Sequence, residues 1–393
     1  MSRSFVVVCV SRQEWDVELP TNRQQMMVRA AARGHEVLFV ENGGHLARHL
    51  WRLLRGPQRR SLWRRLASGE QVAALIRVRK SIVLAPWGQK FELMNRINAR
   101  LTALLLRARL RKARKSAVLW LYDPSAFELV DACGEVFALY DCVDDYAEQV
   151  GFDARRRRVV AAADAEAARR ADVVVVTTRG LAERQRTRNP ETYLVGNGAD
   201  FDHFSGIEPG GVAPEVASLP RPLVGFAGNL TARKLDFLLL DEVAAARPDW
   251  TFVLVGPATT EAAPSVERLA ARRNVVWLGP RTYAELPRYV AAFDVAVIPY
   301  AANDYTRNCS PLKVYEYLAA GKPVVASGVP SLAGMEPDVV LADGPEAFLA
   351  AVANALVPAQ NGALRRRRAL AAANTLDRRA ARILELVSER LGA

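Results

Sequence analysis

The sequence has 393 residues, half of them hydrophobic, and a mean hydropathy near zero. This composition is enough for two or three folded domains and excludes a largely disordered chain. The net charge of +12 arises in the first 200 residues, which carry 34 Lys and Arg against 22 Asp and Glu, whereas the remaining residues carry 20 of each.

The ends and the cysteines indicate a cytoplasmic protein. The apolar run at 5–10 lacks the long apolar region and cleavage site of a signal peptide and is typical of a buried first strand. No stretch reaches the roughly 18 uninterrupted apolar residues of a membrane span. The four cysteines form no CxxC pair, which predicts reduced thiols and no structural zinc site.

Apolar, strand-like runs alternate with helical segments along the whole chain. In the first half the pattern predicts helices at about 21–33 and 154–170, and strands at 4–10, 35–41, 116–122, 135–141, 172–178 and 192–198. The second half repeats the alternation, with strands at 222–228, 251–257, 275–279, 294–300 and 323–327, helices at about 235–246, 266–272, 285–292 and 312–320, and a helical tail at about 364–392.

Such alternation predicts βαβ units, and therefore an α/β fold of two Rossmann-like, doubly wound domains. A stretch rich in Gly, Pro and Asp at 195–220 separates them, with the linker at about 200–215. We expect domains at 1–204 and 205–375, and a C-terminal helix at 376–393 that packs back on the first domain. Ligands of such sheets bind at the carboxyl ends of the strands, so a central cleft is the expected site.

The segment 310–327, SPLKVYEYLAAGKPVVAS, has the clearest local pattern. Ser310 is a good N-cap, Pro311 suits the first helical position, and a short helix from Leu312 is expected to end before Gly321. The helix N-terminus and Lys313 would together attract an anion such as a pyrophosphate. Glu316, one turn further, could accept hydrogen bonds from sugar hydroxyls. The alternative is an ordinary surface Lys–Glu pair.

This segment resembles the donor-binding signature of GT-B glycosyltransferases, especially those similar to family 4. The resemblance extends over most of the chain, through 171–184, 195–204, 225–240, 274–300 and an N-terminal stretch similar to bacterial envelope polysaccharide transferases. It implies a GT-B fold and transfer from a nucleotide-diphosphate sugar, with UDP favoured, to a saccharide or lipid-linked acceptor. It also implies that donor-binding residues are Gly228, Asn229, Arg233, Lys234, Trp277, Arg281, Asn308, Ser310, Pro311, Leu312, Lys313 and Glu316.

The chain departs from the family 4 pattern at one position. Retaining members carry two Glu separated by seven residues, and the first of them corresponds here to Asn308. The segment 135–149 instead resembles the Asp-Asp segment of the xanthan glucuronosyltransferase, an inverting GT-B enzyme whose N-domain aspartate is the proposed base. Asp144 or Asp145 is therefore the candidate base, and the alternative is that these residues cap the next helix.

The resemblance implies no metal and no cofactor, because GT-B enzymes stabilise the leaving diphosphate with a helix dipole and basic side chains. Lys313, Arg233 and Lys234 would supply that charge. Asn303, Tyr305, Thr306 and Arg307 could line the sugar pocket or form an ordinary loop. His35 and His203 are expected to be structural.

Two basic stretches, 48–66 and 96–115, contain no acidic residue, and the first interleaves Arg with Trp and Leu. This pattern favours peripheral binding to an anionic membrane at the inner face, or else a solvated surface. No nucleic-acid-binding motif is present. Two other functions remain open, a sugar-nucleotide epimerase of the same fold and an inactive scaffold. A Rossmann dehydrogenase is disfavoured because no GxGxxG follows the first strand.

Overall fold

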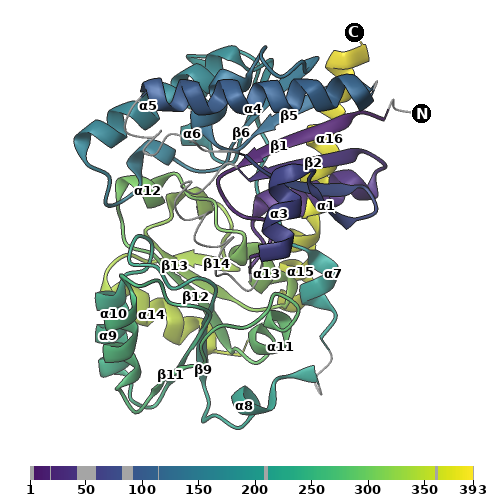
Figure 1. Cartoon of the computed structure of the whole chain (residues 1–393). Helices are drawn as coiled ribbons and strands as arrows, with labels where there is room; N and C mark the ends of the chain where they lie inside the picture. Colours follow the sequence, from purple (N-terminus) through teal and green to yellow (C-terminus); the bar gives the residue numbers. More distant parts are fainter. Residues whose placement is uncertain are drawn as a thin grey trace. The chain divides into compact units, whose positions relative to one another are not determined.

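The computed structural model describes residues 4–17, 19–41, 59–81, 92–113, 115–207, 211–358 and 362–392. It divides into two compact units (Figure 1). The first comprises Met1–Val195 together with Ala380–Ala393, and the second comprises Gly196–Arg379. The division at 195/196 falls a few residues before the linker expected from the sequence.

The first unit is built on a sheet whose eight described strands run in the order β3-β4-β2-β1-β5-β6-β7-β8. Every neighbouring pair is parallel except β3 and β4, which are antiparallel. The central strands are fully buried because helices cover both faces, as in a doubly wound sheet. Their bounds are β1 Val6–Ser11, β2 Glu36–Glu41, β3 Glu70–Ala73, β4 Ile76–Lys80, β5 Ala117–Leu121, β6 Phe137–Cys142, β7 Val173–Val176 and β8 Thr192–Leu194.

The described helices of this unit include the long α4, which packs against the short helix η1 (Figure 1). The helix α5 has the predicted bounds because Asp153 accepts a hydrogen bond from the Arg156 backbone and caps it. The bounds are α1 Asn22–Ala32, α3 Arg59–Ala67, α4 Glu92–Ala113, η1 Pro124–Leu129, η2 Tyr146–Glu148, α5 Ala154–Arg170 and α6 Arg179–Arg186.

The second unit contains a parallel sheet in the order β11-β10-β9-β12-β13-β14. This is the classic order of a dinucleotide-binding fold, in which the strand order reverses between β9 and β12 and leaves a crevice at their carboxyl ends. Gly228 and Lys313, two of the predicted donor-binding residues, lie at that switch point. The bounds are β9 Leu223–Ala227, β10 Thr251–Val255, β11 Val275–Trp277, β12 Val295–Pro299, β13 Val324–Ser327 and β14 Val339–Leu341.

Helices follow most strands of the second unit, as the alternation predicts (Figure 1). Their bounds are α7 Phe201–Ser205, α8 Pro214–Ala217, α9 Phe237–Ala246, α10 Ala263–Ala270, α11 Leu286–Val290, α12 Asp304–Arg307, α13 Lys313–Ala319, α14 Pro345–Leu356 and α15 Ala363–Ala373. The final helix, α16, spans Leu376–Gly392.

The helical tail expected at 364–392 consists of two helices, and the second, α16, has nearly the bounds of the C-terminal helix expected at 376–393. Between α15 and α16 the backbone pairs with Ala199, whose N–H donates to the Asn374 carbonyl and whose carbonyl accepts from Leu376. Gly198 lies against the same turn, where a Cβ would come within 2.6 Å of the Asn374 carbonyl oxygen. In a continuous helix, the Asn374 carbonyl and the Leu376 N–H would form hydrogen bonds within the helix. Because both are bonded to Ala199 instead, the helix is interrupted between α15 and α16.

Two further expectations concern the chain as a whole. All four cysteines are buried and unbridged. No helix of the described residues is long and apolar enough to cross a membrane.

Candidate functional site

Two glycines and a lysine converge at the switch point of the second unit. Gly228 follows β9 with φ +140°, and a Cβ on it would lie 2.9 Å from both Cε and Nζ of Lys313. Gly256 follows β10 with φ +137°, and a Cβ there would lie 2.1 Å from the Gly228 carbonyl oxygen. Only glycine fits either position. The Lys313 ammonium is therefore held directly against the loop after β9.

Aromatic rings surround this ammonium group. Lys313 Nζ lies 5.1 Å from the centre of the Phe226 ring and donates to the Tyr300 hydroxyl at 3.4 Å. The Tyr300 ring also lies 5.9 Å from the ammonium of Lys234, which is 5.2 Å from Tyr305. Two like charges thus share one aromatic ring at the strand ends, an arrangement that a bound anion would stabilise.

The loop after β9 places the other predicted phosphate-facing residues beside Lys234. Asn229 and Arg233 are exposed, and the Arg233 carbonyl accepts a hydrogen bond from the Asn303 side chain at 3.3 Å. Asn303 and Thr306 form a capping box at the start of α12, and Thr306 is completely buried. Asn303 and Thr306 therefore shape this loop as structural residues.

The helix α13 starts later than predicted. Its N-cap is Leu312, which has helical backbone angles and no side-chain cap, so the prediction of Ser310 as N-cap is wrong. The Ser310 carbonyl, which an N-cap would offer to the helix, instead accepts the Asn197 amide at 2.6 Å. Pro311 and Leu312 supply the first turn, and Asn308 ends α12.

The C-terminal part of α13 follows the prediction. Gly321 has φ +80°, as expected for a residue that terminates a helix in the left-handed conformation. Within the helix, the buried Tyr317 hydroxyl contacts both the backbone N–H and the carbonyl of Ala227, at 2.9 and 3.2 Å. This contact fixes the helix to the end of β9, one residue before Gly228.

Glu316 lies one turn after Lys313 and is half-buried. Burial raises the pKa of its carboxyl from 4.5 to about 7, against the lowering effect of Lys313 and with a further rise from Asp200. Because this pKa is raised, folding favours the protonated form, and ionisation between about pH 4.5 and 7 lowers the free energy of unfolding.

We expect this titration to appear in binding of the nucleotide-sugar donor that the sequence resemblance implies. An ionised Glu316 accepts hydrogen bonds from ribose or sugar hydroxyls more strongly than the neutral acid does. The affinity for UDP-glucose, whose diphosphate does not titrate in this range, should rise several-fold from about pH 6 to about pH 8. Calorimetric titration at both pH values checks this, with Glu316→Gln as the matched variant. The same pH dependence in wild type and variant would contradict the assignment.

Trp277 and Arg281 lie at the far side of the same sheet end. The Trp277 indole N–H donates to the Gly256 carbonyl at 3.0 Å and so supports the second glycine loop. Arg281 donates to the Leu278 carbonyl and the Tyr289 hydroxyl, both at 2.6 Å, and forms an ion pair with Glu215. These contacts hold the turn after β11 and raise the pKa of Arg281, chiefly through Tyr289.

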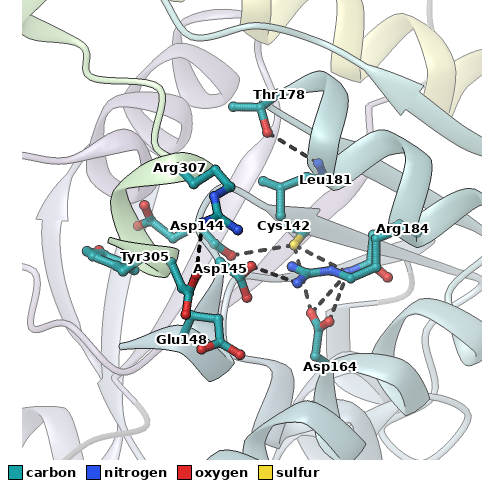
Figure 2. A network of polar contacts seen from close by, with 12 residues as sticks. Cys142, Asp144, Asp145, Glu148, Asp164, Thr178, Leu181, Arg184, Tyr305 and Arg307 are labelled. Atoms are coloured by element: carbon teal, nitrogen blue, oxygen red, sulfur yellow. Dashed lines mark hydrogen bonds and ion pairs between the residues drawn. The ribbon is translucent and has the colours of Figure 1, made fainter. Parts of the chain in front are cut away.

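In the first unit, the two candidate bases differ in their surroundings (Figure 2). Asp145 is buried, and its carboxylate accepts a hydrogen bond from Arg184 at 2.7 Å. Asp144 is half-buried, and its charge is among the causes that raise the pKa of Arg23 against the opposing effect of burial. Asp141 is fully buried and accepts from the Trp120 indole.

Arg23 is a site residue that the sequence analysis did not identify. It lies in the first turn of α1, where it donates to Gln13 at 3.2 Å and to the Tyr146 hydroxyl at 3.3 Å, and its guanidinium lies 5.5 Å from the centre of the Tyr122 ring. The loops after β1, β5 and β6 supply these partners, so Arg23 marks the switch point of the first sheet. Its position just after the β1 loop was the only available signal.

The remaining candidates have structural contacts. His35 stacks on Phe5, and His203 stacks on Tyr283 and contacts its carbonyl oxygen at 2.9 Å. Within the described part of the chain, no three His, Cys, Asp or Glu side chains group in a way that could hold a metal ion.

Comparisons with known proteins connect this geometry to a family. Residues 221–357 match the model of glycosyl transferases group 1. The "Putative teichuronic acid biosynthesis glycosyltransferase TuaH" of Bacillus subtilis is 33% identical over 240 residues, which cover 57% of this chain and 59% of the relative. The match therefore spans less than two thirds of that protein.

Three solved structures share the fold over nearly the whole chain. Sucrose-phosphate synthase from Thermosynechococcus elongatus has a TM-score of 0.74 at 16% identity, covering 99% of this chain and 100% of its own. Anabaena HepE in complex with UDP and glucose has a TM-score of 0.66 at 16% identity, covering 98% and 100%. Trehalose 6-phosphate synthase from Burkholderia multivorans has a TM-score of 0.68 at 12% identity, covering 99% and 97%.

These similarities confirm the predicted fold. The chain has the GT-B fold, and its residues 221–357 are similar to glycosyl transferases group 1.

Proposed function

We propose that the chain transfers a sugar from a nucleoside-diphosphate sugar, with UDP as the favoured nucleotide, to a saccharide or lipid-linked acceptor in envelope polysaccharide synthesis. The observation that carries the proposal is the Lys313 ammonium held against Gly228 at the switch point of the second sheet. The UDP complexes of HepE and the teichuronic acid relative support the donor and the pathway class.

The donor would bind through its diphosphate. The ammonium groups of Lys313 and Lys234 lie 6.0 and 5.9 Å from the centre of the Tyr300 ring, and the exposed Arg233 precedes Lys234 in the same loop. Their positive charges would neutralise the leaving nucleoside diphosphate, so we propose a transfer that requires no divalent metal. Glu316 would accept hydrogen bonds from donor hydroxyls, and Gly228 and Gly256 would allow the phosphates to approach the backbone.

The chemical step would be a displacement at the anomeric carbon. The acceptor hydroxyl oxygen forms the new glycosidic bond, and the bond between the anomeric carbon and the diphosphate oxygen breaks. The nucleoside diphosphate leaves with the bonding electron pair. Asp144 takes the hydroxyl proton as the attack proceeds. A single displacement of this kind inverts the anomeric configuration, which nuclear magnetic resonance of the product tests.

The function is tested first by nucleotide selectivity. Calorimetric titration of the whole chain with UDP, GDP and their common sugar conjugates should show one nucleotide bound clearly and the other weakly or not at all, with the same affinity when EDTA is added. If the folded protein binds none of these ligands, the result would favour the alternative that the protein is an inactive scaffold. If the protein converts a UDP-sugar to its epimer without any acceptor, the result would favour the alternative that the protein is a sugar-nucleotide epimerase.

We further propose that α4 holds the chain on an anionic membrane surface. The outward face of this helix exposes Leu93, Ile97 and Leu104, with exposed fractions of 64%, 39% and 67%. The arginines at 96, 100, 107 and 111 are exposed on the same helix, and each Arg near an anionic surface contributes about 1 kcal/mol. On α3, Trp63 is 59% exposed between Arg60 and Arg64. Most of the basic stretch 48–66 lies outside the described residues.

Flotation with phosphatidylglycerol vesicles tests this surface. The wild type should float, Leu104→Ser and Arg100→Glu should float markedly less, and added salt should release the protein. Leu238→Ser and Arg268→Glu are matched controls, because Leu238 is also 67% exposed and Arg268 is exposed, on helices of the other unit. Equal flotation of all these variants would contradict the proposal.

A further inference from the structure

The loop that carries Asp144 is fastened on both sides of that residue. Before it, the Val143 carbonyl accepts a hydrogen bond from the Thr177 hydroxyl at 3.0 Å. After it, the Asp145 carboxylate accepts from Arg184 at 2.7 Å. The Cys142 thiol also donates to the Asp144 carbonyl at 3.7 Å. The main chain of Asp144 is thus fixed by the segment from the end of β7 into α6 and by β6.

The Asp145–Arg184 contact is a largely buried ion pair. The two side chains face each other (Figure 2). The Asp145 side chain is 3% exposed and that of Arg184 is 32% exposed. Asp145 precedes η2 at the N-cap position, yet its side chain makes no capping hydrogen bond. This geometry removes the helix-cap explanation of the second aspartate, because its carboxylate is directed to α6 instead.

Arg184 in turn belongs to a helix that is itself well anchored. Thr178 caps α6 by accepting from the Leu181 N–H at 3.3 Å (Figure 2). Gln185, near the end of α6, and Arg188, two residues after it, both donate to the buried Asp164, at 3.0 and 2.6 Å. The guanidinium that meets Asp145 is therefore presented from a rigid support.

We propose that Asp145 and Arg184 form a positioning pair that holds the Asp144 carboxylate where it can take the acceptor proton, while Asp145 itself takes no proton. The proposal rests on the proposed function and divides the two aspartates between two roles. A carboxylate that is buried and bonded to a guanidinium would have to give up that contact before it could reach an acceptor hydroxyl. Asp144 is half-buried, so its carboxylate is less enclosed than that of Asp145, and its charge acts on Arg23.

The electrostatics agree with this division. Burial alone would lower the pKa of Arg184, but the hydrogen bond and the charge of Asp145 outweigh burial and raise it. Arg184 therefore stays charged over the whole range in which a general base would titrate. Truncating one member leaves the other charge poorly compensated, so single variants are expected to be less stable than the double variant.

The experiment compares Asp145→Asn, Arg184→Lys, the double variant Asp145→Asn with Arg184→Gln, and Asp144→Asn. Transfer is followed as UDP release from UDP-glucose, UDP-N-acetylglucosamine or UDP-glucuronate with octyl glucoside as acceptor. Asp145→Asn should lower kcat about 10-fold to 100-fold, the range expected for a base displaced by about 1 Å, with KM for the donor unchanged. Arg184→Lys keeps the positive charge, so it should lower kcat less than Asp145→Asn does.

The pH profile separates positioning from proton transfer. Asp145→Asn should keep the acid limb of the kcat/KM profile at reduced height, whereas Asp144→Asn should lose it. Arg366→Met is the matched control, because it removes an arginine from Asp338, whose side chain is 3% exposed like that of Asp145, and leaves the loop at 143–145 untouched. It should destabilise the fold comparably and leave kcat unchanged.

Two results would overturn the proposal. Loss of the acid limb in Asp145→Asn, with its retention in Asp144→Asn, would make Asp145 the base. Wild-type kcat in folded Asp145→Asn and in the double variant would show that the pair positions nothing. Failure of the proposed function looks different, since the wild type would then release no UDP and bind no UDP-sugar. Thermal melts identify any variant that is unfolded. If a single variant is unfolded, the double variant, which is expected to be more stable, tests the proposal.

Discussion

Asp144→Asn is expected to lower kcat for sugar transfer by about 10²–10⁴-fold, the contribution of a general base. The amide has nearly the shape of the carboxylate but cannot accept the hydroxyl proton. The proposed donor site belongs to the other unit, so the Kd for the UDP-sugar should stay within about twofold of the wild-type value. Steady-state kinetics and calorimetric titration of the same preparation measure the two effects.

Asp153→Asn serves as the control for this variant. Asp153 is exposed and caps α5, and Asn caps a helix as well as Asp does. It should retain wild-type kcat and thermal stability. Wild-type turnover in folded Asp144→Asn would remove the base from the proposed mechanism, and a donor Kd weakened in parallel with kcat would point to a folding defect.

Lys313→Met is expected to weaken the binding of the UDP-sugar by about 10-fold to 100-fold, because a hydrogen bond to a charged group contributes about 1.5–3 kcal/mol. Methionine retains the apolar contact with Phe226 and Gly228 and removes only the ammonium group. The weakening should be smaller for uridine, which lacks the diphosphate. Calorimetric titrations with both ligands measure the difference.

Lys115→Met is the matched control for the lost charge. The Lys115 ammonium is paired with Glu36 in the first unit, at 2.6 Å, and has no place in the donor site. The affinity of Lys115→Met for the UDP-sugar should equal that of the wild type. An equal loss of affinity for uridine and for the UDP-sugar in Lys313→Met would argue against a contact with the diphosphate.

The sequence predicted the ends of helices correctly where the residue that sets the end is a neighbour in the sequence. The helix 154–170 has the predicted bounds because Asp153 caps it from the adjacent position. The end of α13 was predicted by Gly321, and its start was not, because the competing partner of Ser310 is Asn197, which is 113 residues away in the sequence. The tail was divided by the pairing of Ala199 with the turn at 374–376, which is also a contact between distant residues.

In the candidate site, too, the sequence predicted contacts within one segment but not contacts between distant residues. Spacing within one segment placed Lys313 and Glu316 on the same side of α13, and the structure sets Lys313 against Gly228. The sequence could not separate Asp144 from Asp145, because the residue that distinguishes them, Arg184, comes from a helix formed 39 residues later. Arg23 was missed for a similar reason, since its partners Tyr122 and Tyr146 come from other strand ends.

The central claim is sugar transfer, and mass spectrometry of the acceptor tests it most directly. The purified chain is incubated with the UDP-sugar that it binds best and with a panel of octyl glycosides and polyprenyl-diphosphate-linked sugars. We predict an acceptor whose mass increases by one sugar residue, with release of one UDP per product and with the product nearly absent in Asp144→Asn. A folded protein that binds the UDP-sugar, yet leaves every acceptor unchanged while Asp144→Asn behaves identically, would contradict the account.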